Sequence, residues 1–271
     1  MLSGCRSTVV GRDLSGRRWD RNALLRSARK PPGVDKAKES ARVSPEALAL
    51  WRSGSGVLKQ EDLPPAPAHS YQMRSHIFAD EFREAELAHL QSHAEAGTWQ
   101  EVDKGQATTK VLNCKWVYVY KFSKDGNLEK FKARLVVRGD EQEKDLLRET
   151  YAATLAMKSF RILMSIATRF DLELRQYDAV NAFVNAKLDE EVYMRMPMGH
   201  GKPGTILKLR RALYGLPRSP LLWQIELTSA LEAIGFVRIS HEPCALIRKG
   251  AIIFFYVDDI ILAYRKQAEQ E

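Results

Sequence analysis

The 271-residue chain has little cysteine and little histidine, and the few of each are scattered. Its three cysteines, Cys5, Cys114 and Cys244, lie far apart and form no CxxC pair, so neither a disulfide framework nor a zinc site is indicated. A sparse, odd set of cysteines fits a reducing compartment best. No run of about 18 residues is free of charge, and the sequence therefore does not predict a transmembrane helix.

What the chain does have is an excess of positive charge. Lysine and arginine together number 42, against 34 aspartates and glutamates, which gives a formal net charge of +8. This balance favours a polyanionic partner, although moderate basicity is also common in enzymes. The chain is 45% hydrophobic, and its length suffices for one or two domains with a core.

Residues 1–75 differ in composition from the rest. Arginine is frequent in the first thirty residues, and SGSG at 53–56 and PPAP at 64–67 are typical of linkers. Two aspartates and weak amphipathicity argue against an organelle transit peptide. We therefore expect a basic, poorly ordered leader and linker over 1–75 and a folded domain over 76–271.

The remaining sequence predicts an α+β fold. Helices are expected over 80–94, 159–170 and from Ser219 to Gly235. Strands are expected over 111–122, 128–138, 172–178, 190–197, 205–210 and 244–264. GHGKPG at 199–204 matches a phosphate-binding pattern only formally, because a strand and not a helix follows it. We interpret it as a turn.

The third helix has clear boundaries in the sequence. Ser219 is expected to be its N-cap, Pro220 its first residue and Gly235 its end. Its predicted buried stripe consists of Trp223, Leu227, Leu231 and Ile234. Just before the cap, Tyr214-Gly215 would permit close backbone approach to a ligand.

One predicted strand, 128–138, carries a row of cations. Lys130, Lys132 and Arg134 alternate with apolar residues, so one face packs and the other is basic. Cations about 7 Å apart suit a phosphodiester backbone or a triphosphate. The alternative is an ordinary solvated edge strand, where lysine is common.

Three carboxylates stand out in the predicted sheet. Asp258 and Asp259 lie between two apolar runs in AIIFFYVDDIILAY (251–264), which predicts a β-hairpin, and turn chemistry alone could explain them. Asp178 ends the predicted strand 172–178 and continues its inward-facing row, where a charge is costly unless paired or bound to a metal. An antiparallel sheet could bring all three together, and divalent cations would relieve their repulsion.

An ordered series of motifs resembles the reverse transcriptase region of Ty1/copia-type retrotransposon polyproteins. The series is CKWVYVYKFSKDGNLEKFKARLVVRG, ETYAATLAMKSFRIL, QYDAVNAFVNAKLDEEVYMRMP, LKLRRALYGLPRSPLLW and FFYVDDIILAY. It covers roughly residues 78–264. The resemblance implies a right-hand polymerase palm and fingers, with a central antiparallel sheet packed on helices and the chain truncated before the thumb. Pro217-Arg218 departs from the Lys-Gln pair usual in the family.

The resemblance also implies roles for individual residues. Asp178, Asp258 and Asp259 would be catalytic and would hold two Mg²⁺ ions, or Mn²⁺, with the backbone carbonyl of Ala179 as a further ligand. Phe183 would be the steric gate that excludes a ribose 2′-hydroxyl, with plain core packing as the alternative. The implied nucleotide-binding residues are Lys132, Arg134, Ala182, Phe183, Tyr214 and Gly215. Those implied to lie beside primer and template are Tyr256 and Val257.

The implied function is RNA-directed DNA polymerisation, the transfer of deoxynucleotides to a primer 3′-hydroxyl. The alternative is an inactive retrotransposon remnant that only binds nucleic acid. Expected partners are an RNA template, a DNA or RNA primer, dNTPs and other parts of a Gag-Pol particle, with no membrane. The expected location is intracellular, in cytoplasmic virus-like particles or the nucleus. The sequence does not indicate an oligomeric state.

Overall fold

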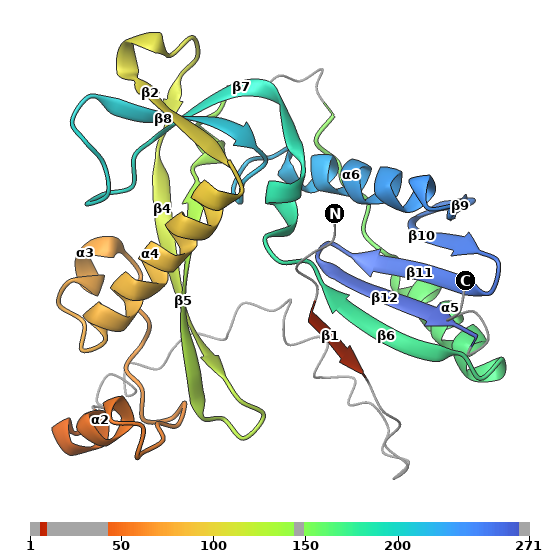
Figure 1. Cartoon of the computed structure of the whole chain (residues 1–271), viewed down its shortest axis with the longest axis horizontal. Coiled ribbons are helices and arrows are strands. Elements are labelled where there is room, and N and C mark those ends of the chain that lie inside the picture. The colour runs from red at the N-terminus through yellow and green to blue at the C-terminus, as the bar shows by residue number, and fades with distance from the viewer. Residues whose placement is uncertain (1–5, 10–42, 144–148, 266–271) are drawn as a thin grey trace. The chain divides into compact units, whose positions relative to one another are not determined.

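The computed structural model, shown in Figure 1, describes residues 6–9, 43–143 and 149–265. These residues fall into two compact units. Among the described residues, unit 1 comprises 6–9, 91–115, 136–143 and 149–265, and unit 2 comprises 43–90 and 116–135. Helices combine with largely antiparallel sheets, which confirms the expected α+β class. Among the helices of these residues, none has the length and apolar character needed to cross a bilayer.

Unit 1 is built on a six-stranded antiparallel sheet with the order β1-β6-β12-β11-β10-β9. Its strands are β1 (Arg6–Val9), β6 (Glu173–Asp178), β9 (Val237–Ile239), β10 (Glu242–Arg248), β11 (Ala251–Tyr256) and β12 (Asp259–Tyr264).

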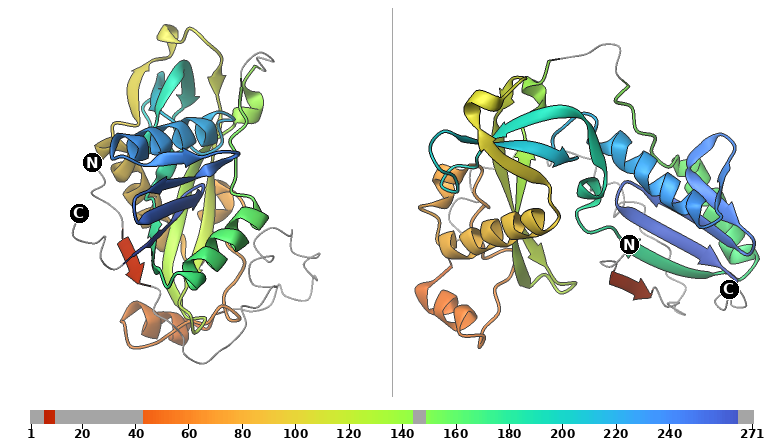
Figure 2. Two further views of the ribbon diagram at one scale, coloured as in Figure 1. Left: turned by 90° about the vertical axis from the view of Figure 1, so that its right-hand side faces the viewer. Right: turned by 45° about the horizontal axis from the view of Figure 1, so that its top comes forward.

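Two helices of unit 1, α5 (Met157–Arg169) and α6 (Ser219–Ala233), cover opposite faces of this sheet (Figure 2). Successive side chains of β11 pack alternately against α5 and against α6, because neighbouring residues of a strand point to opposite faces of the sheet. Phe254 packs with Leu163 of α5, whereas Phe255 packs with Trp223 of α6. The sheet is therefore buried on both sides along most of β11.

A second, four-stranded sheet of unit 1 has the order β2-β8-β7-β3, in which only β3 and β7 run parallel. Its strands are β2 (Trp99–Asp103), β3 (Val111–Leu112), β7 (Lys187–Arg195) and β8 (Thr205–Arg211). The described residues of unit 1 also form three short 3-10 helices, namely η2 (Lys104–Gln106), η3 (Gly139–Glu141) and η4 (Ala182–Asn185). The expected turn at 199–204 precedes β8 without an intervening helix, as predicted.

Unit 2 packs helices against a β-hairpin through aromatic side chains. Its described elements are α2 (Pro45–Arg52), α3 (Ser70–Met73), most of α4 (Ala79–Glu95) and most of the hairpin β4 (Cys114–Phe122) and β5 (Leu128–Val137). The Phe82 ring makes edge contacts with Tyr118 and Phe131 at centroid distances of 5.2 and 5.0 Å. Such edge-to-face pairs add stability beyond the area they bury.

The described part of the expected leader, residues 43–75, carries helices and buried side chains. Ser44 caps α2 by accepting a hydrogen bond from the Ala47 N–H at 3.1 Å. Leu58, Leu63 and Met73 are buried. Apart from β1, the rest of the expected leader lies outside the described residues, so the boundary at residue 75 stays a prediction.

The third predicted helix exists, but three of its details were wrong. Pro220 is its second residue and not its first, because the helix begins at Ser219. Arg218, not Ser219, is the N-cap residue, because the buried Ser219 hydroxyl donates to the Leu213 carbonyl at 2.7 Å and accepts from the Leu213 N–H at 3.0 Å. Ile234 is exposed, since it lies at the C-cap beyond the last full turn. Gly235 ends the helix with φ +89°, as expected.

At the end of β5, the backbone passes in direct contact with the backbone of the loop 212–216. The Val137 N–H donates to the Tyr214 carbonyl at 2.8 Å. A Cβ on Gly215, where φ is +98°, would overlap the Val137 carbonyl oxygen, and a Cβ on Gly139 would overlap the Gly215 carbonyl oxygen. Both crossing segments therefore need glycine.

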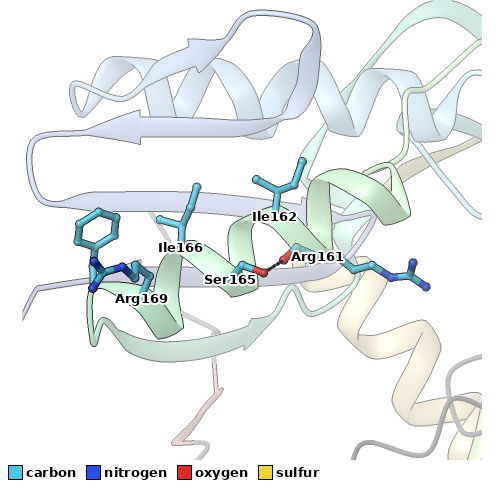
Figure 3. A pocket seen from close by; sticks show the side chains of 6 residues that line it. Arg161, Ile162, Ser165, Ile166 and Arg169 are labelled. Carbon is cyan, nitrogen blue, oxygen red and sulfur yellow. Dashed lines mark hydrogen bonds between the residues drawn. The ribbon is translucent and has the colours of Figure 1, made fainter.

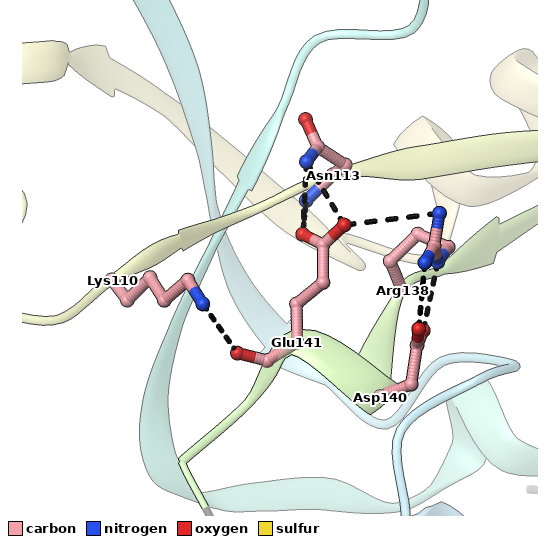
Figure 4. A network of polar contacts seen from close by, with 5 residues as sticks. All are labelled: Lys110, Asn113, Arg138, Asp140 and Glu141. Atoms are coloured by element: carbon pink, nitrogen blue, oxygen red, sulfur yellow. Dashed lines mark hydrogen bonds and ion pairs between the residues drawn. The ribbon is translucent and has the colours of Figure 1, made fainter.

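A polar network fixes the turn that follows this crossing (Figure 4). Arg138 donates to the Asp140 carboxylate at 2.8 and 2.7 Å, which lowers the pKa of Asp140 to about 2. Glu141 accepts from the backbone and side-chain N–H groups of Asn113, and its own carbonyl accepts from Lys110 at 2.9 Å. The network ties η3 to the segment before β4.

Gly215→Ala is expected to lower the free energy of unfolding by about 3 kcal/mol or more, because it adds backbone overlap to an unfavourable φ. Gly204→Ala is the matched control, with φ +84° and nothing within 4 Å of the added Cβ. It should cost only about 1 kcal/mol. Urea unfolding of both variants measures the difference, and equal losses would contradict the close crossing.

Candidate functional site

The three predicted carboxylates meet at one end of the six-stranded sheet. β6 and β12 are antiparallel neighbours, and their register places Asp178 directly opposite Asp259. Directly opposed residues of such a pair have Cβ atoms about 5 Å apart. The Ala179 N–H donates to the Asp258 carbonyl at 3.0 Å. The expectation that the strand ending at Asp178 lies beside the acidic hairpin is confirmed.

The expectation that Asp178 continues an inward-facing row is wrong. Leu174 packs with the cluster around α5, but Gln176 and Asp178 further along the same face are exposed. The apolar cover of the sheet ends before the strand does. The carboxylates therefore lie at an accessible sheet end and not in a dry interior.

Three negatively charged carboxylates lie close together at this end of the sheet, and one of them is partly buried. The pKa of Asp259 is raised, chiefly by partial burial and further by the negative charges of Asp258 and Asp178. A hydrogen bond from the Gln176 amide at 3.3 Å acts in the opposite direction. A cation bound here would relieve the repulsion.

The donor set suits a hard divalent cation, because it consists of carboxylate and carbonyl oxygens. Within the described ranges, no three His, Cys, Asp or Glu side chains converge as a metal site. The backbone nevertheless brings two carboxylates into direct opposition and a third into the adjoining turn. The residues fit the chemistry of Mg²⁺ or Mn²⁺.

The turn between β11 and β12 contains the residues expected beside the primer. Tyr256 pairs with Asp259 and is 55% exposed. Val257 has φ +57°, and its carbonyl accepts a hydrogen bond from the Trp223 indole N–H at 2.7 Å. Both residues directly precede the acids in the chain.

Four of the expected nucleotide-binding residues are also brought together. Ala182 and Phe183 lie on η4, just after Asp178, and both are buried. The rings of Phe183 and Tyr214 are 4.5 Å apart between centroids, and Gly215 is exposed next to them. Phe183 also belongs to the core cluster around α6, so it has the packing role that was its alternative reading.

The other two, Lys132 and Arg134, lie on β5 within unit 2. They are half-buried and alternate with buried Phe131, Ala133 and Leu135, which confirms the predicted two-faced strand.

Three residues with roles around the site were missed by sequence reasoning. Trp223 was assigned to helix packing alone, although a buried indole N–H generally needs a partner, which was a usable signal. Gln176 contacts Asp259, and Arg218 pairs with the Asp189 carboxylate. No sequence pattern indicates these last two partners.

A hollow on the outer side of α5 lies away from these residues (Figure 3). Ile162, Ile166 and Phe170 form its apolar part, with Arg161 and Arg169 beside them. Its lining includes none of the predicted site residues, so the acids and not this hollow form the candidate site.

Comparison with known proteins gives an independent result. Residues 96–270 match the family model described as reverse transcriptase (RNA-dependent DNA polymerase). The chain is 34% identical over 191 residues to the retrovirus-related Pol polyprotein from transposon RE2 of Arabidopsis thaliana, which covers 68% of this chain and 13% of that protein.

Two further relatives are similar. The Pol polyprotein from transposon RE1 of the same plant is 35% identical over 173 residues, 61% of this chain and 12% of that protein. That from transposon TNT 1-94 of Nicotiana tabacum is 32% identical over 207 residues, 72% of this chain and 15% of that protein. The chain thus spans 12–15% of the length of these curated relatives.

Asp259→Asn is expected to stabilise the metal-free protein at neutral pH by about 0.5 kcal/mol, a value that allows for solvent screening. A raised pKa means that folding disfavours the ionised form, so the wild type loses stability as pH rises through the folded pKa. The gain should vanish below the unfolded pKa of about 3.9.

Urea unfolding with EDTA at low salt, at pH 7 and pH 3.5, measures this gain. Asp103→Asn, at the end of β2 in the second sheet, controls for the loss of one negative charge. A loss of stability in Asp259→Asn at pH 7 would contradict the crowding of charges.

Proposed function

The chain belongs to the reverse transcriptase (RNA-dependent DNA polymerase) family, and on that premise we propose that it carries out RNA-directed DNA synthesis. The observation that carries the proposal is the direct opposition of Asp178 and Asp259, with Asp258 in the adjoining turn. Clustered carboxylates of this kind are the donor set used for metal-assisted phosphoryl transfer. The primer 3′-oxygen forms a bond to the α-phosphorus of a dNTP, and the bond to the pyrophosphate breaks.

The acids are proposed to bind the metal ions of this reaction. The ligands of two Mg²⁺ ions would be Asp178, Asp258, Asp259 and the carbonyl oxygen of Ala179. When bound, the ions lower the pKa of the attacking hydroxyl and neutralise the departing pyrophosphate. The chain's own contribution is to hold the carboxylates in register through the β6–β12 ladder and the hydrogen bond from Ala179 to Asp258.

Residues beside the acids are proposed to select and bind the nucleotide. The Phe183 ring is fixed by the core and by Tyr214, so it can act as a rigid wall against a ribose 2′-hydroxyl. The accessible backbone of Gly215 and its partner Tyr214 would pack against the nucleotide and the templating base. Ala182 would line the same site.

Charge and the motif match support the remaining contacts. Lys132 and Arg134 would bind the triphosphate, since cations spaced along a strand suit phosphate oxygens. Tyr256 and Val257, which precede the acids on the hairpin, would lie beside the primer end. These roles rest on the motif match.

We further propose that the six-stranded sheet of unit 1 is a polymerase palm and that the β4–β5 hairpin belongs to the fingers. The substrates would be an RNA template, a DNA or RNA primer and dNTPs. Because the relatives are Pol polyproteins, a Gag-Pol particle is the proposed setting, in the cytoplasm or the nucleus.

Asp178→Asn and Asp258→Asn are each expected to lower primer extension on an RNA template by about a hundredfold or more, because each removes a charged metal ligand. Incorporation of labelled dNTPs with Mg²⁺ measures the effect, and Asp103→Asn should leave it unchanged. Equal incorporation by Asp258→Asn and the wild type would contradict the proposal. Salt-dependent RNA binding without incorporation would support the binding-only alternative.

Phe183→Ala is expected to lower the preference for dNTPs over rNTPs by about tenfold or more, because it removes the proposed wall. Competing dNTP and rNTP incorporation measures the preference. Phe160→Ala is the matched control, since this ring packs against Phe254 on the other face of the sheet. A similar loss of preference in both variants would mean that core destabilisation, not a steric gate, is responsible.

A further inference from the structure

The turn that presents the acids has an unfavourable backbone conformation. Four non-glycine residues in the described part of the chain have positive φ, and three of them are Asp171, Asn181 and His241. Asparagine, aspartate and histidine tolerate this region. The fourth is Val257, at +57°, and a β-branched side chain there is strained. Something in the surrounding structure must hold it.

Trp223 provides that restraint from α6. Its indole N–H donates to the Val257 carbonyl at 2.7 Å, and its side chain is only 4% exposed. The indole packs in the same core cluster as Phe255 and Ile260, the residues on either side of the turn. A buried indole N–H without a partner would be costly, so the ring and the turn fix each other.

The neighbouring peptide is held from the other side. The Asp258 carbonyl accepts from the Ala179 N–H at 3.0 Å, one residue beyond the end of β6. Two consecutive carbonyls of the turn are thus tied to different elements, Val257 to α6 and Asp258 to the β6 end. Their directions set the orientation of the backbone from which the Asp258 and Asp259 side chains project.

We infer that Trp223 is a positioning residue of the proposed metal site. Its indole N–H holds the Val257 carbonyl, and with it the strained turn, so that Asp258 and Asp259 face Asp178. The catalytic consequence rests on the proposed function, whereas the restraint of the turn does not.

Two substitutions separate this role from plain core packing. Trp223→Phe keeps an aromatic ring in the core but removes the hydrogen-bond donor. Val257→Gly removes the strain, because glycine adopts positive φ freely. If Trp223 acts through the strained turn, Val257→Gly should rescue Trp223→Phe, whereas a packing defect would not respond to it.

Amide hydrogen exchange of the full chain tests the restraint without any activity. With selective ¹⁵N-alanine labelling, Ala179 reports its bond to Asp258, and Ala263, inside β12, reports the stability of the whole sheet. In Trp223→Phe, Ala179 exchange should rise about tenfold while Ala263 stays unchanged. The double variant with Val257→Gly should return Ala179 towards the wild-type rate.

Unchanged Ala179 exchange in Trp223→Phe would overturn the inference. An equal rise at Ala263, or a failure of Val257→Gly to rescue, would overturn it as well, because either points to lost packing.

Primer extension with varied Mg²⁺ tests the catalytic consequence. In Trp223→Phe, the Mg²⁺ concentration for half-maximal rate should rise about tenfold, with a smaller change in KM for dNTP, and the double variant should recover. An unchanged Mg²⁺ requirement would overturn this part. If the wild-type chain incorporates nothing, the proposed function fails, and the exchange measurements still decide whether Trp223 restrains the turn.

Discussion

The antiparallel pairing of β6 with β12 is the interaction on which the site depends. Its register alone puts Asp178 opposite Asp259, and a slip of one residue would turn every side chain of β12 to the other face. The register is held by apolar faces on both sides, with α5 packed on one and α6 on the other. The same core that stabilises the sheet therefore sets the spacing of the acids.

Two features at this end of the sheet lower the stability of the folded protein. Partial burial, together with the negative charges of Asp258 and Asp178, raises the pKa of Asp259, and Val257 adopts a backbone conformation that its side chain disfavours. Neither would persist without support from the surrounding structure, and such costs tend to occur at functional sites. Trp223 and Ala179 supply the support through hydrogen bonds to consecutive carbonyls of the turn. The binding of a divalent cation would relieve the repulsion between the carboxylates.

The sequence allowed much of this arrangement to be predicted, because strand and helix periods report which face is buried. The acidic hairpin and the two-faced strand around Lys132 followed from those periods. The approach of Asp178 to Asp259 was expected only as one arrangement that an antiparallel sheet allows. Contacts between residues that are distant in the chain could not be predicted from these periods. The bond from Trp223 to Val257 and the binding of the Ser219 hydroxyl to Leu213 depend on tertiary contacts that no local pattern specifies.

Composition was a weaker guide than periodicity. Residues 43–75 are rich in linker chemistry, yet Leu58 and Met73 within them are buried in the structure. A few apolar residues are enough to order such a segment when each of them packs against a core. Likewise, the alternation in β6 predicted an inward Asp178 because it could not show where the cover from α5 ends.

In the working complex, Asp178, Asp258 and Asp259 are proposed to bind two divalent ions together. Electron paramagnetic resonance of Mn²⁺, titrated into the full chain with an RNA template, a non-extendable primer and a dNTP, tests it most directly. Two tightly bound ions per chain are expected above those held by the nucleic acid and dNTP alone, and Asp178→Asn should lose them. Unchanged Mn²⁺ binding in that variant, or none in the wild type, would contradict it.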